Sequence, residues 1–341
     1  MDRNFFTAWA ENSAEGTRHN ASTGITISSD TTMYAVWEPL TITRFSGGNR
    51  IITANTIALE GWPQGASTVI LASGSNFVDA LAAAPLAAHY DAPILLSSSK
   101  TTLEDTVLST IDALKAAHII IIGGESSVNK DIYTQLEGLN FKVERLAGGN
   151  RYTTAIEVAK ALQADSVEFT SVFLADGANF PDALSVSPVA GILQQPILFT
   201  NKGDTAKVND DTGKYIQSAG IADVTIVGGG ISDAVADNLK SAYGVASTKS
   251  LSGSNRYATA VAVNAEYKSI FTGSVVTLTT GTNYPDALAG SAYSAKIGAP
   301  LFLLKNDQTL DDVQSAIQEL APHAVYIYGG AVDDATVNNH I

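Results

Sequence analysis

The stretch that decides the fold is an eight-residue motif that occurs three times: GSNFVDAL at residues 74–81, GANFPDAL at 177–184 and GTNYPDAL at 281–288. Each copy follows a short apolar run and opens a segment rich in small and apolar residues, which predicts a strand, a loop and a helix. Three further signatures accompany the motif in the same order, at offsets of 101 to 105 residues. Four ordered signatures at one period establish an internal repeat.

The other signatures are a Gly-Gly-Asn-Arg turn, a proline before an apolar strand, and a strand that ends on a glycine pair. The turns occupy residues 47–50, 148–151 and, with serine as the second residue, 253–256. The prolines, tolerated at a strand's first residue, are Pro93, Pro196 and Pro300. The glycine pairs begin at Gly123, Gly228 and Gly329.

Each copy alternates short apolar runs with helical patterns. In the first copy, strands are predicted over residues 41–45, 69–72, 93–96 and 119–122, and helices over 50–59, 79–89, 103–116 and 128–136. Apolar runs of this length between helices are typical of a parallel sheet covered on both faces. The predicted fold is therefore α/β, with three tandem flavodoxin-like or Rossmann-like modules.

The phase of the repeat sets the expected domains. We assign the strand before each Gly-Gly-Asn-Arg turn to the copy that follows it, because the two are contiguous in the chain. The domains predicted in this way are a partial small β unit at 1–39 and three modules at 40–141, 142–245 and 246–341. A chain that begins with Met inside such a β unit is what a fragment of a longer protein would show.

Composition and charge narrow the function classes. The 341 residues contain no cysteine, which excludes disulfides, thiolate nucleophiles and Cys-ligated zinc. A net charge of −14 argues against nucleic acid as a partner, because that partner needs a basic face. No apolar run could span a bilayer, and no apolar segment follows Met1, so neither a transmembrane helix nor a signal peptide is predicted.

Each eight-residue motif carries an asparagine and, three residues later, an aspartate. The asparagines are Asn76, Asn179 and Asn283, and the aspartates are Asp79, Asp182 and Asp286. Asparagine followed by an acid at this spacing is typical of a helix N-cap with a capping box, so we favour a capping role. Loops at the carboxyl ends of parallel strands also bind ligands, so ligand contact stays open.

The turn arginines recur in step with those aspartates. Arg50, Arg151 and Arg256 either bind phosphate or carboxylate groups of a polymer or form partly buried Arg–Asp pairs that join helix to loop or module to module. The second interpretation is favoured because both partners repeat together. The glycine-rich turns match neither nucleotide-binding pattern. The histidines do not recur at matched positions, so we expect no enzyme activity, no cofactor and no metal.

Together these segments resemble the cell wall binding repeat 2 family, in which modules occur in threes on Gram-positive surface proteins. The resemblance rests on RFSGGNRI, RLAGGNRY and SLSGSNRY, the N-[FY]-x-D-A-L motifs and the apolar strands after each proline. The first copy departs at Ile51 and Val78, and the third at Ser254. Residues 6–9 (FTAW) and 30–37 (DTTMYAVW) resemble the Listeria–Bacteroides repeat of surface proteins.

The resemblance implies a secreted, wall-associated monomer, anchored without covalent bonds, as S-layer-like proteins are, to an anionic secondary cell wall polymer. The partner would be a wall polysaccharide or a teichoic-acid-like polymer. It further implies a pseudo-threefold trimer of modules within one chain, with grooves near the module junctions. Polymer-binding candidates are the three turn arginines, the motif asparagines Asn76, Asn179 and Asn283, and the turn asparagines Asn49, Asn150 and Asn255.

The family's anchoring strands fall here on Ile94, Leu95, Leu96, Ile197, Leu198, Phe199, Leu301, Phe302 and Leu303. Their apolar character predicts core positions, because an apolar parallel strand cannot bind a polyanion. The chain's acidity opposes a polyanionic partner, although salt screens that repulsion beyond roughly 10 Å at 0.1 M. The alternatives are a small-ligand-binding or enzymatic domain that uses one divergent cleft, and a structural spacer.

Overall fold

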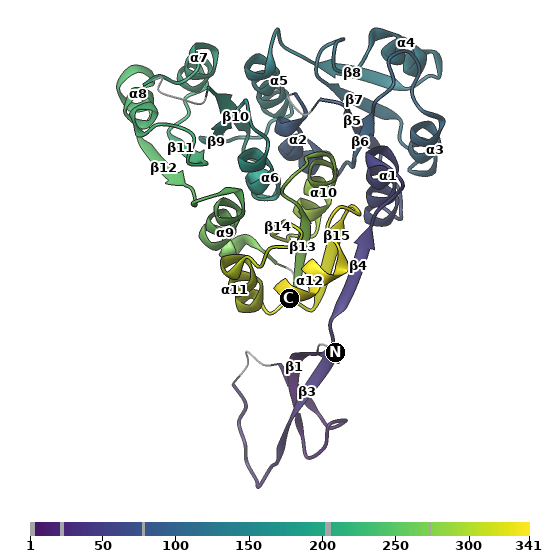
Figure 1. Ribbon diagram of the computed structural model, residues 1–341, viewed down its shortest axis with the longest axis vertical. Helices are drawn as coiled ribbons and strands as arrows, with labels where there is room; N and C mark the ends of the chain where they lie inside the picture. Colours follow the sequence, from purple (N-terminus) through teal and green to yellow (C-terminus); the bar gives the residue numbers. More distant parts are fainter. Residues whose placement is uncertain (1–3, 21–23, 77–78, 202–205, 273) are drawn as a thin grey trace.

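The computed structural model describes residues 4–20, 24–76, 79–201, 206–272 and 274–341. Three α/β modules are grouped around a common centre, and a small β unit extends from one of them (Figure 1). Each module contains a four-stranded parallel sheet. Two of the sheets have the order second, first, third, fourth along the chain, and in the third sheet the strand at residues 41–45 takes the fourth position. This order is that of a flavodoxin-like sheet, and it confirms the predicted fold class.

The strands of the three sheets share the lengths and spacing of the repeat. The first sheet contains β6 (Ile94–Ser97), β5 (Thr68–Ser73), β7 (His118–Ile122) and β8 (Lys142–Leu146). The second contains β10 (Ile197–Thr200), β9 (Ser171–Asp176), β11 (Asp223–Val227) and β12 (Ser247–Leu251). The third contains β14 (Leu301–Leu304), β13 (Val275–Thr280), β15 (Ala324–Tyr328) and β4 (Thr41–Phe45).

Helices cover both faces of each sheet. The first module has α1 (Arg50–Gly61), the short 3-10 helix η1 (Ala80–Ala82), α2 (Ala83–His89), α3 (Asp105–Ala113) and α4 (Lys130–Gly138). The second has α5 (Arg151–Ala164), α6 (Pro181–Leu193), α7 (Asp210–Ser218) and α8 (Asp233–Tyr243). The third has α9 (Arg256–Glu266), η2 (Lys268–Ile270), α10 (Pro285–Lys296), α11 (Asp311–Leu320) and α12 (Asp334–His340).

The apolar strands after the prolines lie in the core. All nine side chains of the expected anchoring strands are at most 1% exposed. The prolines precede the strands by one residue, and their carbonyls accept hydrogen bonds from Ile70, Phe173 and Thr277 of the neighbouring central strands at 2.9–3.0 Å. Because these strands are sealed from solvent, substitutions in them act through folding and module packing.

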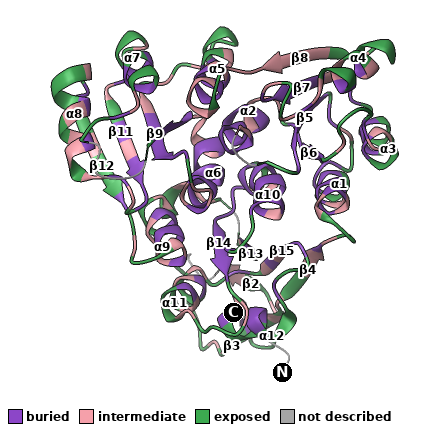
Figure 2. Ribbon diagram, turned by 45° about the horizontal axis from the view of Figure 1, so that its top comes forward, coloured by how far each residue is buried: buried purple, intermediate pink, exposed green. Residues whose placement is uncertain are grey.

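The helices that follow the eight-residue motifs meet at the centre of the molecule. Helices α2, α6 and α10 pack against one another, and Figure 2 shows α6 buried along most of its length. Small side chains allow this approach. A Cβ at Gly191 of α6 would collide with Ala295 of α10 and press on Ala88 of α2. One apolar core therefore runs through all three modules.

The fourth strand of each sheet differs from the sequence-based assignment. We assigned the strand before each turn to the copy that follows it, but β8 pairs with β7 of the preceding copy and β12 pairs with β11. Strand β4 precedes the first copy and pairs in parallel with β15 of the third, from Thr41↔Ala324 to Phe45↔Tyr328. The first strand of the repeat region thus closes a ring, and the sequence-based domain boundaries stay a proposal.

The junction between the third and first modules contains an aromatic cluster. Phe45 of β4 lies 5.8 Å from Tyr293, 5.3 Å from Tyr326 and 6.1 Å from Tyr328, measured between ring centroids. Trp62, which follows α1, lies 5.9 Å from Tyr293. The other two copies have no aromatic residue at any of these five positions. The equivalents are Leu146 and Leu251 for Phe45, Leu86 and Val189 for Tyr293, Ile120 and Thr225 for Tyr326, Ile122 and Val227 for Tyr328, and Gln163 and Lys268 for Trp62.

The aromatic cluster therefore occurs only at the junction that joins the last module to the first. A salt bridge adds to it, because Lys296 of α10 lies 2.6 Å from a carboxylate oxygen of Asp91. Trp62 donates its indole N–H to the backbone carbonyl of Asp91 at 2.6 Å. Aromatic pairs add about 0.5–1.5 kcal/mol each beyond the area that they bury, so this junction has side-chain contacts that the others lack.

The β unit is a three-stranded antiparallel sheet in the order β2-β1-β3, made of β1 (Asn4–Glu11), β2 (Arg18–Asn20) and β3 (Met33–Pro39). Its small core consists of Ala8, Ala10 and Val36. Over the described residues, no helix is long and apolar enough to cross a membrane.

The aromatic cluster predicts unequal costs for matched truncations. We expect Phe45→Ala to lower the free energy of unfolding by about 3–5 kcal/mol, because it empties a fully packed aromatic position. Leu146→Ala, the same position at the next junction, should cost less because Leu146 is only partly buried. Urea denaturation followed by circular dichroism measures both. Equal losses would contradict a special role for this junction.

Candidate functional site

The turn arginines clamp the loop that carries the eight-residue motif, at the carboxyl edge of each sheet. Arg50 donates from Nη1 to the carbonyl of Gly74 at 2.6 Å, and Arg256 donates likewise to Gly281 at 2.6 Å. Arg151 makes the same bond to Gly177. All three arginine residues are partly exposed. A guanidinium has five N–H donors, so this clamp leaves others directed elsewhere.

The clamp reaches across module junctions. Tyr284 of the third module donates its hydroxyl to the carbonyl of Gly74 at 2.8 Å and lies 3.4 Å from Nη1 of Arg50. Its ring centroid is 5.7 Å from Cζ of Arg50. At the next junction, Cζ of Arg256 lies 5.6 Å from the ring centroid of Phe180. The motif aromatic of one module thus packs against the turn arginine of another. Residues 77 and 78, including the departure at Val78, lie outside the described residues.

The two sets of asparagines differ from expectation. Asn49, Asn150 and Asn255 are the N-caps of α1, α5 and α9, and each side-chain oxygen accepts from two backbone N–H groups. The residues expected to cap do not occupy that position. Helices α6 and α10 begin at Pro181 and Pro285, whose fixed φ suits the first helical position.

The N-caps of these two helices are accordingly the aromatic residues, without a side-chain capping bond. Asn179 and Asn283 lie one residue earlier, and Asn76 lies in the loop before η1. Asn76 and Asn283 are exposed and Asn179 is partly exposed. The capping-box interpretation is therefore wrong for α6 and α10. In the first copy Asp79 is the N-cap residue of η1 but makes no side-chain capping bond.

The motif aspartates lie over the first glycine of each glycine pair. Asp79, Asp182 and Asp286 are placed so that a Cβ at Gly123, Gly228 or Gly329 would collide with Oδ2 of the facing carboxylate. These glycines have φ of +105°, +99° and +86°, a conformation that side chains with a Cβ disfavour. The eight-residue motif and the glycine pair therefore recur together because their residues touch. Arg50 also acts electrostatically on Asp286 of the neighbouring module, and the expected Arg–Asp pairing stays a prediction.

Two arginines that the sequence analysis passed over complete this edge. Arg44 and Arg145, on the fourth strands, donate from Nη1 to the carbonyls of Gly329 and Gly123, both at 2.8 Å. The signal was available, because arginine stands six residues before the turn arginine in two copies. The third copy has Ser250 at this position, so the second sheet lacks this bond to Gly228.

The carboxyl edge of the first sheet holds a polar groove of about 260 Å³. Serines from three successive loops line it, together with two asparagines, Lys100 and Glu125. Ser73 accepts from the backbone N–H groups of Ser75 and Asn76, and Ser97 donates to Glu104 at 2.7 Å. Such a surface can exchange hydrogen bonds with polyhydroxylated molecules. Among the residues that the structure describes, no group of three or more His, Asp or Glu side chains could hold a metal ion.

Three repeats with this geometry, grouped in one ring, match a known protein family. The cell wall binding domain 2 (CWB2) family matches residues 44–133, 145–237 and 250–336. The chain belongs to the CWB2 family. Each match begins at or near a fourth strand and ends within the last helix of a copy, so all three modules are CWB2 modules. The chain is accordingly a wall-binding one.

The CWB2 region is similar to two proteins of Bacillus subtilis. It is 34% identical over 268 residues to N-acetylmuramoyl-L-alanine amidase LytC of Bacillus subtilis, covering 78% of this chain and 51% of LytC. It is 29% identical over 289 residues to the amidase enhancer of the same organism, covering 84% of this chain and 38% of the enhancer. The chain therefore spans about half, or less, of the length of these relatives.

Solved structures share the arrangement of the modules. Cwp6 from Clostridium difficile superimposes with a TM-score of 0.81 at 25% identity, covering 98% of this chain and 50% of Cwp6. Cwp8 from the same organism gives a TM-score of 0.75 at 25% identity, covering 94% of this chain and 57% of Cwp8. The arrangement of the three modules is thus shared with Cwp6 and Cwp8.

The contact between aspartate and glycine predicts a sharp difference between adjacent glycines. Gly329→Ala should lower the free energy of unfolding by about 1–2 kcal/mol from its positive φ alone, with a further cost from the collision with Asp286. Gly330→Ala is the matched control, because a Cβ there meets nothing within 4 Å. Thermal and urea denaturation distinguish the two variants. Comparable destabilisation by both would refute the contact.

Asp286 predicts a pH-dependent contribution to stability. Burial raises the pKa of its carboxyl group, and the charge of Arg50 opposes that rise. The folded chain therefore holds this proton more tightly than the unfolded chain. The stabilising contribution is fully present below the unfolded pKa of about 3.9 and is lost as the pH rises through the folded pKa.

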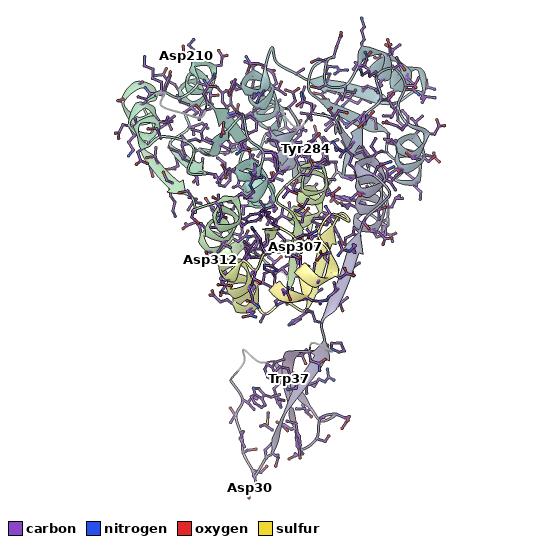
Figure 3. All side chains as sticks on the ribbon, viewed as in Figure 1. Asp30, Trp37, Asp210, Tyr284, Asp307 and Asp312 are labelled. Carbon is purple, nitrogen blue, oxygen red and sulfur yellow. The ribbon has the colours of Figure 1, made fainter. Side chains whose placement is uncertain are left out.

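The side chain of Asp286→Asn cannot ionise. The free energy of unfolding of this variant, relative to that of the parent, should therefore be higher at pH 7 than at pH 4. Asp30→Asn, at the exposed tip of the β unit (Figure 3), controls for the loss of a carboxylate. Urea denaturation at the two pH values provides the comparison. If the difference in unfolding free energy between Asp286→Asn and the parent were the same at both pH values, burial would not raise the pKa of this carboxyl group.

Proposed function

We propose that this chain anchors a surface protein to the Gram-positive wall through multivalent, non-covalent binding of an anionic secondary wall polymer. The observation that carries the proposal is the match of all three modules to the CWB2 family within a ring like that of Cwp6. In this proposal the three modules are non-catalytic, and the amidase activity named for LytC belongs to that protein.

The polymer would contact the carboxyl edges of the sheets. There the partly exposed arginines Arg50, Arg151 and Arg256 stand beside loops held at fixed positions. In the first module, the serine-lined groove with Lys100 adds hydroxyl groups and a positive charge. These local groups offset the net charge of −14 at short range, where screening by salt is incomplete.

Three weak sites on one rigid ring bind a long polymer more tightly than any one of them. Once one site is engaged, the others bind at a high effective concentration, so the combined affinity rises without new contacts. The shared core of the three modules supports this display, because it fixes the sites relative to one another. The exposed motif asparagines, and the proposed likeness of the β unit to the Listeria–Bacteroides repeat, belong to the same proposal.

The first test is co-sedimentation of the chain with Gram-positive walls before and after acid extraction of the secondary polymers. Retention should fall after extraction and should weaken as salt rises, because charges contribute to it. Retention that survives extraction would point to peptidoglycan as the ligand. No retention on walls of the source organism would refute anchoring and favour a spacer or a small-ligand domain.

Charge removal at the clamp then tests the site itself. Arg256→Gln keeps an N–H donor for the carbonyl of Gly281 but removes the charge. We expect roughly fivefold weaker retention, the factor that corresponds to about 1 kcal/mol. Arg18→Gln is the matched control, because Arg18 pairs with Glu38 on the exposed β unit and changes the net charge equally. Equal losses in both variants would show only a general charge effect.

A further inference from the structure

The β unit carries an aromatic face that its own core does not use. Phe6, Trp9 and Trp37 form this face, with ring centroids 5.2 Å apart for Phe6–Trp9 and 5.7 Å for Phe6–Trp37. Trp37 is 58% exposed and Trp9 is 39% exposed. The core residues Ala8 and Val36 pair with each other on the opposite side of the sheet. Two tryptophans are therefore left to solvent by a unit with very few apolar residues to bury.

The aromatic face continues into a groove against the third module. The groove has a volume of about 430 Å³, within the range of about 300–1,000 Å³ typical of ligand sites. Phe6 and Trp37 line one side, and Ile317 and Pro322 line the other. Figure 3 places Trp37 in the part of the β unit nearer the modules, and Asp30 at its far tip. The tryptophan thus stands at a junction between two folded units.

The side chains that line this groove carry no charge. Among the described residues that line it, the polar side chains are the amides of Asn4 and Gln318, and no lysine, arginine, aspartate or glutamate takes part. A phosphate- or carboxylate-rich polymer requires basic partners, and a cationic peptide requires carboxylates. In a chain of net charge −14, a groove without charged side chains favours a neutral ligand.

We propose that this groove binds an uncharged pyranose glycan. A pyranose ring presents an apolar C–H face, which can stack on the exposed ring of Trp37, and hydroxyl edges, which can bond to the two amides. Tryptophan suits such an interface because it combines a large apolar surface with a polar tip. The CWB2 modules bring the chain to a wall in which glycans are abundant. This site is separate from the carboxyl edges of the sheets, and it selects an uncharged ligand instead of an anionic one.

The test titrates the full chain with two neutral probes, chitohexaose and cellohexaose, and follows tryptophan emission and binding heat. The chain has three tryptophans, and Trp62 is only 4% exposed, so a change in emission reports on Trp9 and Trp37. We expect at least one probe to bind and to shift the emission. Trp37→Ala should weaken binding about tenfold or more, and Trp37→Phe, which keeps a ring, should weaken it less.

Tyr34→Ala is the matched control, because Tyr34 lies on the same strand, is 43% exposed and does not line the groove. Its binding should equal that of the parent. Absence of binding to both probes overturns the proposal, as does equal weakening by Tyr34→Ala. A third outcome would also overturn it: the parent chain binds no glycan but self-associates, and Trp37→Ala abolishes the self-association. The groove would then bind a second copy of the chain. Wall co-sedimentation separates this site from the anchoring site. The part of the retention that acid extraction of the walls removes depends on the secondary polymer, and Trp37→Ala should leave that part unchanged.

Discussion

The pairing of β4 with β15 is the constraint on which the rest of the structure depends. Each sheet takes its fourth strand from the segment that leads into the next copy, so three copies in a row would leave the last sheet one strand short. Strand β4 fills that position from the other end of the repeat region. The ring then places α2, α6 and α10 in mutual contact at the centre, and the aromatic cluster of Phe45, Trp62, Tyr293, Tyr326 and Tyr328 stabilises the junction without a covalent connection.

The carboxyl edge of each sheet is built from contacts between signatures that lie far apart in the sequence. The turn arginine holds the motif loop through a glycine carbonyl, and the motif aspartate lies over a glycine with positive φ. Across two junctions, the motif aromatic packs against an arginine of another module. Module packing and the shape of the candidate binding edge therefore share the same residues. A ligand at one edge would meet a surface already fixed by the ring.

Local structure was accessible from the sequence because its causes are local. The strands over 69–72 and 119–122 were predicted to within one residue at each end, since their apolar runs admit few alternatives. Three features escaped prediction. The partner of β4 is a pairing across nearly the whole chain, whereas contiguity favours neighbours. Asn179 was predicted to be a helix N-cap, but Pro181 fixes where α6 begins and leaves Asn179 outside that position. Asn49, predicted to bind polymer, is instead the N-cap of α1. The role of Arg44 required knowing which glycine its strand would face.

The short connection between the β unit and the ring has a mechanical consequence. Strand β3 ends at Pro39 and β4 begins at Thr41, so tension applied through the β unit enters the ring along β4. Because β4 runs parallel to β15 and bonds to it over its whole length, that tension acts as shear on all their hydrogen bonds together. A load in this direction is shared among the bonds instead of opening them one by one. The strand that completes the ring is therefore also an attachment point that is loaded in shear.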